Sequence, residues 1–206
     1  MARNAPHLVS VLGTLWGYQD PLEPLIRGAA DARYPELYEA VDDRPARDVE
    51  PVVDEILNVF GDPRVDDQAW RRLGYIGRAL LIEVGRTISG HWPAATSTAQ
   101  AVLAALDEWL SSSSLPALLD DHIDGPRAPQ AIAEAIDVVR NAARLTDRSC
   151  ARDAVAEMVD DCLQGYAVFP GSAGRRSLFD WWLHDVVPAA WSLQRPVRFR
   201  DAAAQA

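Results

Sequence analysis

Apolar residues recur at intervals of three and four along most of this chain, which is the spacing of one buried helical face. The longest such stripe runs from about Asp67 to Ile88 and holds its period over some six turns. Its apolar positions are Trp70, Leu73, Ile76, Leu80, Leu81, Val84 and Ile88, and the arginines of the stretch fall mostly off the stripe. This pattern predicts a helix at the centre of the core.

The same periodicity predicts helices on both sides of that element. Residues 48–61 carry a clear apolar stripe, with Pro51 in the first turn and Gly61 at the end. A helix capped by Thr96, Ser97 or Thr98 should reach Leu110. Further helices are expected over residues 8–16, 20–26, 35–41, 114–119, 129–145, 149–163 and 178–188, the last of them bent or ended near Pro188.

No segment alternates with period two for long enough to predict a strand. We therefore expect an all-α fold, a compact bundle of about eight or nine amphipathic helices, with two helical layers as one arrangement. A length of 206 residues fits one compact domain. We assign residues 1–194 to a single all-helical domain and residues 195–206 to a frayed C-terminal tail.

Composition narrows the function classes. The net charge is −10, which disfavours nucleic-acid binding and favours a basic protein partner. No apolar run approaches the roughly 20 residues that span a bilayer, and no clean signal-peptide cleavage site follows the N-terminus, so we predict a cytoplasmic protein without membrane contact. All basic residues are Arg, with no Lys, which suggests the high-GC coding bias of some bacteria.

The chain carries no convincing catalytic signature. Cys150 and Cys162 are expected in one helix, where twelve residues separate them by roughly 18 Å, too far for a disulfide. No Cys/His spacing suggests zinc and no GxSxG elbow occurs. We therefore predict no cofactor and no catalytic residue.

The most polar interruption of the helical pattern is the segment 111–129, which contains the cluster DDHID. This cluster resembles the first aspartate-rich motif, DDxxD, of all-helical prenyl-diphosphate enzymes, where aspartates hold magnesium on the diphosphate. The resemblance covers five residues and implies a divalent-metal site at Asp120, Asp121 and Asp124.

Two observations favour another interpretation of the cluster. Asp160-Asp161 is the other acidic pair of this half, but its surroundings do not resemble the second metal motif of terpene cyclases. Gly125-Pro126 also ends the short helix where the motif should project. Asp120, Asp121 and Asp124 are therefore expected to form a solvated acidic patch that is offered to a partner.

The seven tryptophans add candidate anchors for such a partner. Trp92 sits near a helix end, and Trp181 points away from Trp182 on the same helix, so one core does not accommodate all of them. Trp and Tyr concentrate in the energetically dominant part of interfaces. The alternative is a last helix that is buried on both sides.

We predict a non-enzymatic protein-binding module, most concretely a small acidic inhibitor or immunity-type protein that neutralises a basic protein partner through Asp120, Asp121, Asp124, Trp92 and Trp181. One alternative is a metal-dependent helical enzyme that uses the DDHID cluster. Another is a regulatory or scaffold protein that associates with itself.

Overall fold

A computed structural model describes residue 26 and residues 50–91, 93–112, 114–119, 130–166 and 174–196. These residues are mostly helical and contain no strand, which confirms the all-α class. The number of helices in the whole chain and their arrangement as a bundle stay predictions. Within the described ranges, no helix combines the length and the apolarity needed to cross a membrane.

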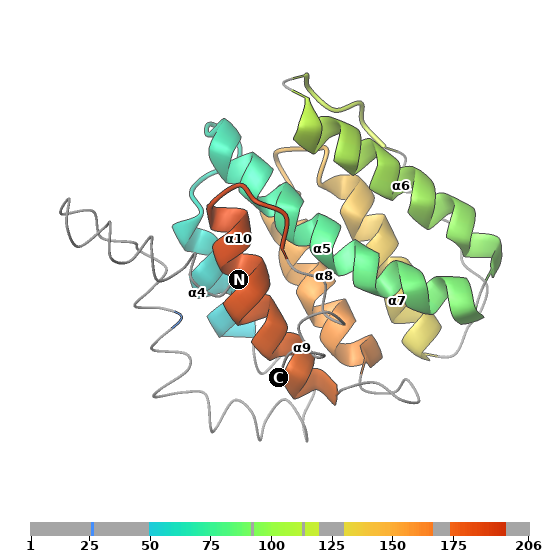
Figure 1. Ribbon diagram of the computed structural model, residues 1–206. Coiled ribbons are helices and arrows are strands. Elements are labelled where there is room, and N and C mark those ends of the chain that lie inside the picture. The colour runs from blue at the N-terminus through green and yellow to red at the C-terminus, as the bar shows by residue number, and fades with distance from the viewer. Residues whose placement is uncertain are drawn as a thin grey trace, which may run out of the picture.

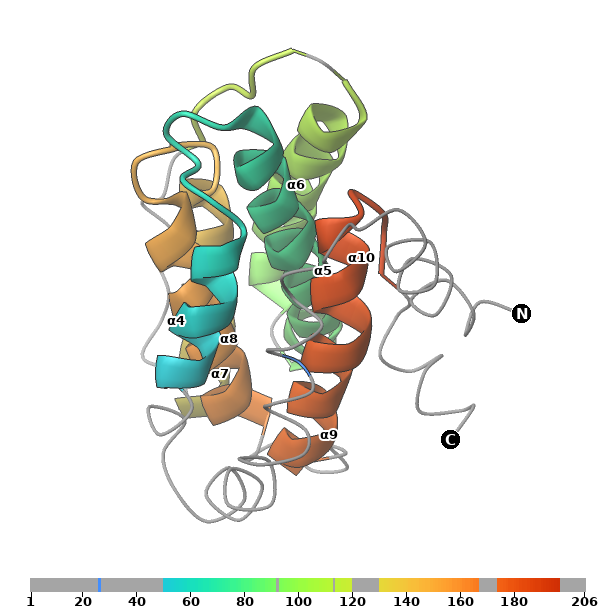
Figure 2. The same cartoon turned by 90° about the vertical axis from the view of Figure 1, so that its left-hand side faces the viewer.

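Figures 1 and 2 show the helices of the described part coloured in chain order. In chain order they are α4 (Glu50–Val59), α5 (Asp67–His91), α6 (Pro93–Ser111), α7 (Gln130–Arg144), α8 (Ala151–Tyr166), α9 (Gly174–Trp181), a π-helix (Trp182–Val186) and α10 (Val187–Trp191). The predicted stripes at 48–61, 67–88, 129–145 and 149–163 each correspond to one of these helices within a few residues.

Helix α5 occupies the centre, as its long apolar stripe predicts. It packs against α6, α7, α8 and α10, and both views show it between them. Glycines permit this close packing: a Cβ atom on Gly74 would lie 2.6 Å from a ring carbon of Trp109, and one on Gly77 would lie 2.2 Å from Cδ1 of Leu145. The missing side chains let α6 and α7 approach the α5 backbone.

Buried polar contacts fix how α5 sits on its neighbours. Nε1 of Trp70 donates a hydrogen bond of 2.8 Å to the backbone oxygen of Leu145, and the Trp70 ring lies 4.6 Å from that of Trp109. Arg72 lies 3.7 Å from the ring centroid of Trp191 and also donates to the backbone oxygen of Trp191. These contacts hold α6, the turn after α7 and the end of α10 against α5.

Helix α4 ends as predicted at Gly61, whose φ of +97° is a conformation that glycine adopts with little strain. Arg152 of α8 reaches across to the same turn. It donates to the side-chain oxygen of Asn58 at 2.8 Å and to the backbone oxygen of Gly61. The contact joins α4 to α8.

The last helical segment, which runs without a break from α9 to α10, is irregular near Pro188, as predicted. Val187 donates its backbone N–H to Trp182 five residues back, which is the hydrogen bond of a π-helix. Proline lacks the N–H of a regular turn and its ring crowds the preceding turn, so a wider turn before it relieves the clash. The helix continues to Trp191, and Leu193 in the turn after it has a φ of 54°.

Four local predictions are wrong. Residues 114–119 are not helical, and Leu115 and Leu118 are 75% and 76% exposed instead of inward. A segment of this length does not sustain a helix by itself. In addition, the backbone N–H of Leu119 donates a hydrogen bond of 3.3 Å to Oγ1 of Thr146.

The predicted caps of α6 and α8 are two further errors. Helix α6 begins at Pro93, so Thr96, Ser97 and Thr98 lie inside it. Before α8, the hydroxyl of Ser149 donates to Asp147 at 2.8 Å instead of capping the helix. The fourth error concerns the cysteines, because Cys150 lies in this turn, outside α8, and so does not share one helix with Cys162, which is buried within α8.

Candidate functional site

The predicted contact residues are only partly covered by the described ranges. Asp120, Asp121, Asp124 and Trp92 lie outside them. Trp181 is described, and the prediction that it anchors a partner at the surface is wrong, because it is only 3% exposed. Its neighbours Trp182 and Leu183 are buried too. The last helical segment is therefore covered on more than one side, as in the alternative of a last helix that is buried on both sides.

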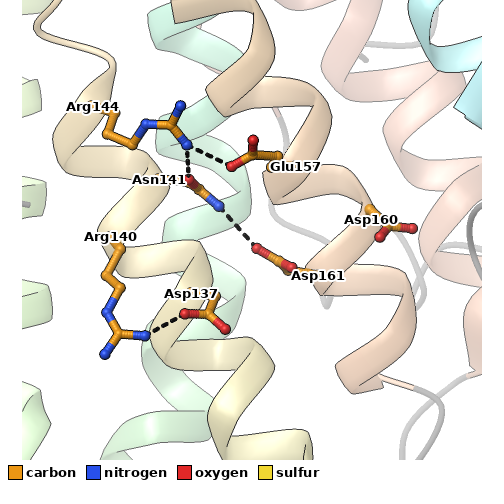
Figure 3. A pocket seen from close by; sticks show the side chains of 7 residues that line it. All are labelled: Asp137, Arg140, Asn141, Arg144, Glu157, Asp160 and Asp161. Atoms are coloured by element: carbon orange, nitrogen blue, oxygen red, sulfur yellow. Dashed lines mark hydrogen bonds and ion pairs between the residues drawn. The ribbon is translucent and has the colours of Figure 1, made fainter. Parts of the chain in front are cut away.

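A polar groove between α7 and α8 is the described feature best suited to binding. Asn141 contacts Asp161, and Arg144 contacts Glu157, so the two helices run antiparallel on either side of the short turn at 145–150. The groove has a volume of about 640 Å³. Its lining comes entirely from these helices (Figure 3), and consists of Asp137, Arg140, Asn141, Arg144, Glu157, Asp160 and Asp161.

The two arginines of the groove each have a carboxylate partner. Arg140 pairs with Asp137 one turn earlier on α7. Arg144 crosses to α8, where its Nη1 lies 2.5 Å from Oε2 of Glu157, and the same nitrogen donates to Oδ1 of Asn141 at 2.7 Å. Both positive charges of the lining are therefore matched within the groove.

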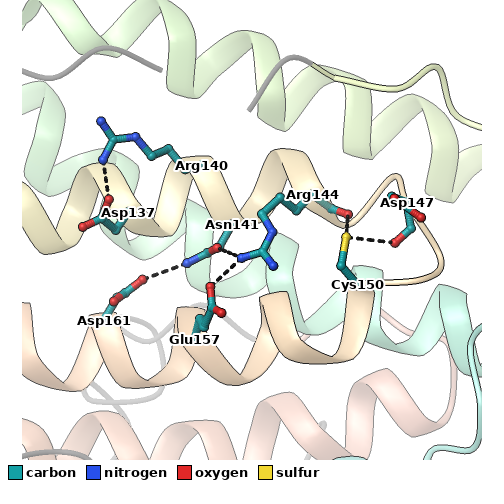
Figure 4. A network of polar contacts seen from close by, with 8 residues as sticks. All are labelled: Asp137, Arg140, Asn141, Arg144, Asp147, Cys150, Glu157 and Asp161. Carbon is teal, nitrogen blue, oxygen red and sulfur yellow. Dashed lines mark hydrogen bonds and ion pairs between the residues drawn. The ribbon is translucent and has the colours of Figure 1, made fainter. Parts of the chain in front are cut away.

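Asp161 lies at the end of a chain of contacts across the groove (Figure 4). It accepts a hydrogen bond of 3.0 Å from Nδ2 of Asn141, a side chain that is only 7% exposed. Burial is the main cause that raises the pKa of Asp161 from 3.8 to about 8; the hydrogen bond from Asn141 opposes the rise, and the nearby carboxylates of Asp137, Glu134 and Asp160 add to it. At neutral pH this carboxyl group is mostly protonated.

Asp160 supplies the other carboxylate that no arginine of the groove matches. Its Oδ2 accepts a hydrogen bond of 2.7 Å from Gln164, while Oδ1 is buried without a hydrogen-bond partner. Figure 3 shows Asp160 pointing away from α7 and Asp161 pointing toward Asn141. The lining therefore holds four carboxyl groups against two guanidinium groups, and the surplus lies on α8.

This arrangement is better suited to binding a positively charged group than to binding a metal ion or to nucleophilic catalysis. No three His, Cys, Asp or Glu side chains of the described ranges are placed to hold a metal ion together. Burial raises the pKa of the Cys150 thiol, and raises that of Cys162 well above its usual range, so neither is an activated nucleophile. What the groove offers is acidic oxygen atoms beside fixed ion pairs.

The sequence contained a signal for this groove. On α7 the lining residues stand at positions 137, 140, 141 and 144, and on α8 at 157, 160 and 161, which is the three-and-four spacing of one helical face. Two polar stripes on consecutive helices joined by a short turn should face the same side. Asp160-Asp161 stands out in the sequence as an acidic pair and not as part of a stripe shared with the preceding helix, so the metal-motif comparison alone does not predict the groove.

The assignment of a site rests on this geometry. The groove is the described cavity with a surplus of acidic groups, and its ion pairs, its buried amide and its protonated carboxyl group define what it can bind. No family model, no curated protein and no solved structure matches the chain.

Proposed function

We propose that the protein is a non-enzymatic binding module for a basic protein partner, and that the α7–α8 groove receives a cationic side chain of that partner. In its most concrete form this is a small acidic inhibitor or immunity-type protein of the bacterial cytoplasm. The observation that carries the proposal is the surplus of two carboxyl groups, Asp160 and Asp161, in a groove whose arginines are already paired.

The charge of the whole chain supports the same conclusion. A net charge of −10 attracts a basic partner from a distance and raises the rate of encounter at low ionic strength. In the groove, a guanidinium or ammonium group would meet oxygen acceptors in a partly buried setting, where salt screens the interaction less than at an open surface. The chain thus combines long-range attraction with a local acceptor site.

The proposal is tested by capture of partners from the native host. The purified chain is immobilised and the captured proteins are identified by mass spectrometry. A groove variant carries Asp160→Asn and Asp161→Asn. A matched control carries Asp54→Asn and Glu108→Gln, which change two exposed carboxylates on α4 and α6.

We expect a basic protein that is captured by the wild type and by the control, and that is lost or strongly reduced with the groove variant. Recovery of partners without a basic surface would contradict the proposal. Equal recovery by both variants would contradict the role of the groove.

A further inference from the structure

The contacts of Asp161 connect its charge to the rest of the groove. Asn141 donates to Asp161 through Nδ2 and accepts from Arg144 through Oδ1, and Arg144 pairs with Glu157. Because Oδ2 of Asp161 accepts the N–H of Asn141, we place the proton of the neutral side chain on the other oxygen, Oδ1. Loss of that proton adds one negative charge at the fixed end of this chain of contacts.

Without that charge, the groove is close to balance. Arg140 with Asp137 and Arg144 with Glu157 are two neutral pairs, which leaves Asp160 as the remaining anion of the lining. Ionisation of Asp161 doubles the unmatched negative charge. The net charge that a basic partner meets in the groove therefore depends on whether Asp161 carries its proton.

The surroundings of Asp161 oppose its ionisation from more than one helix. Helix α7 contributes the carboxylates of Asp137 and Glu134, and α8 contributes Asp160. On the next residue of α8, Cys162, burial raises the pKa of the thiol, and the carboxyl groups of Asp161 and of Glu83 on α5 raise it too. The nearest guanidinium groups of the lining are engaged by other carboxylates.

The remaining helices packed on α8 are α4 and α9. Asn58 of α4 contacts Arg152 of α8. Arg152 lies nine residues before Asp161, which is about 13 Å along the helix axis. Helix α9 carries Asp180, which is partly buried.

We propose that Asp161 is a protonation switch for the groove: a cationic side chain of the partner displaces its proton, so the partner binds more tightly as the pH rises. This inference rests on the proposed function and specifies its regulation. The cation replaces the proton as the neighbour of the carboxyl oxygen, and the proton leaves to the solvent. The raised pKa of Asp161 places this exchange near neutral pH.

The binding test uses nona-arginine as the probe, because guanidinium groups stay charged throughout the range and the pH response then belongs to the protein. Titration calorimetry at low salt is done at pH 6 and pH 9, and at pH 7 in two buffers of different ionisation enthalpy. We expect affinity about tenfold higher at pH 9 than at pH 6, the effect of one added nearby charge, which corresponds to a pKa about one unit lower in the complex and to release of about 0.4 proton at pH 7. In Asp161→Asn, the affinity should change less than about twofold and no proton should be released.

A second measurement decides the switch without any partner. Carboxyl carbon resonances of the free protein are followed by NMR as a function of pH, and the signal lost in Asp161→Asn identifies the residue. Titration near pH 8 supports the switch, and titration near pH 4 overturns it. Binding of nona-arginine that is independent of pH, without proton release, also overturns the switch but leaves the proposed function in place. A failure of the wild type to capture a basic partner would overturn the proposed function itself.

Discussion

Substitution of Asp161 by Asn should stabilise the protein, by an amount that grows with pH. The amide has nearly the same shape, and its oxygen can still accept the hydrogen bond from Asn141. It carries no charge that burial and three neighbouring carboxylates would oppose. The variant therefore keeps the contacts of the protonated side chain and removes the unfavourable ionisation.

The pKa of Asp161 gives the sign and the size of this effect. It is raised from 3.8 to about 8 in the folded protein, so its contribution to stability is fully present below pH 4 and is lost as the pH rises through 8. Each pKa unit corresponds to about 1.4 kcal/mol. Because the groove opens to water, which stabilises the carboxylate, we take about half of the full effect, which is about 1 kcal/mol at pH 5 and about 3 kcal/mol at pH 9.

The assay is urea unfolding of the wild type and of Asp161→Asn at pH 5, 7 and 9, with the free energy of unfolding extrapolated to water at each pH. Asp54→Asn is the control, since it makes the same chemical change at an exposed position on α4. We expect the difference between Asp161→Asn and wild type to widen with pH, while Asp54→Asn differs from wild type by a small and constant amount. A difference between wild type and Asp161→Asn that stays constant with pH would show that the Asp161 carboxyl group does not have a raised pKa.

Two further substitutions test the packing and the last turn. Gly77→Ala should lower the free energy of unfolding by about 1–2 kcal/mol, because a Cβ at 2.2 Å from Leu145 outweighs the better helix propensity of alanine; a thermal melt with an unchanged or raised Tm would contradict this. Leu193 has a φ of 54°, and the backbone N–H of Gln194 bonds to Ala189 in a Schellman turn. Leu193→Gly should therefore be more stable than Leu193→Ala by about 1 kcal/mol in urea unfolding, and equal stability would show that this turn is not strained.

The central helix could be predicted because its pattern is long and consistent. Six turns of apolar spacing identify α5, and Gly61 marks the end of α4 through a backbone requirement that is local to the sequence. Local rules failed where tertiary contacts decide the outcome. Residues 114–119 have a plausible cap and first turn, yet Leu119 bonds to Thr146 on a distant turn instead of continuing a helix.

The candidate site depended on pairing that periodicity alone does not reveal. Polar stripes on α7 and α8 are visible in the sequence, but which carboxylate meets which arginine follows from the antiparallel packing of the two helices. The same holds for the burial that makes Asp161 unusual. Trp181 shows the opposite error, because its place on the second side of a helix suggested exposure until that side proved to be covered.

We propose that the α7–α8 groove binds a cationic side chain of a basic partner. The most direct test of this proposal is the dissociation constant of the captured partner for wild type, for Asp160→Asn with Asp161→Asn, and for the control pair Asp54→Asn with Glu108→Gln. We expect at least about tenfold weaker binding for the groove variant and a change of less than about twofold for the control. Equal weakening by both pairs would mean that net charge determines the affinity, which would rule out a specific role of the groove.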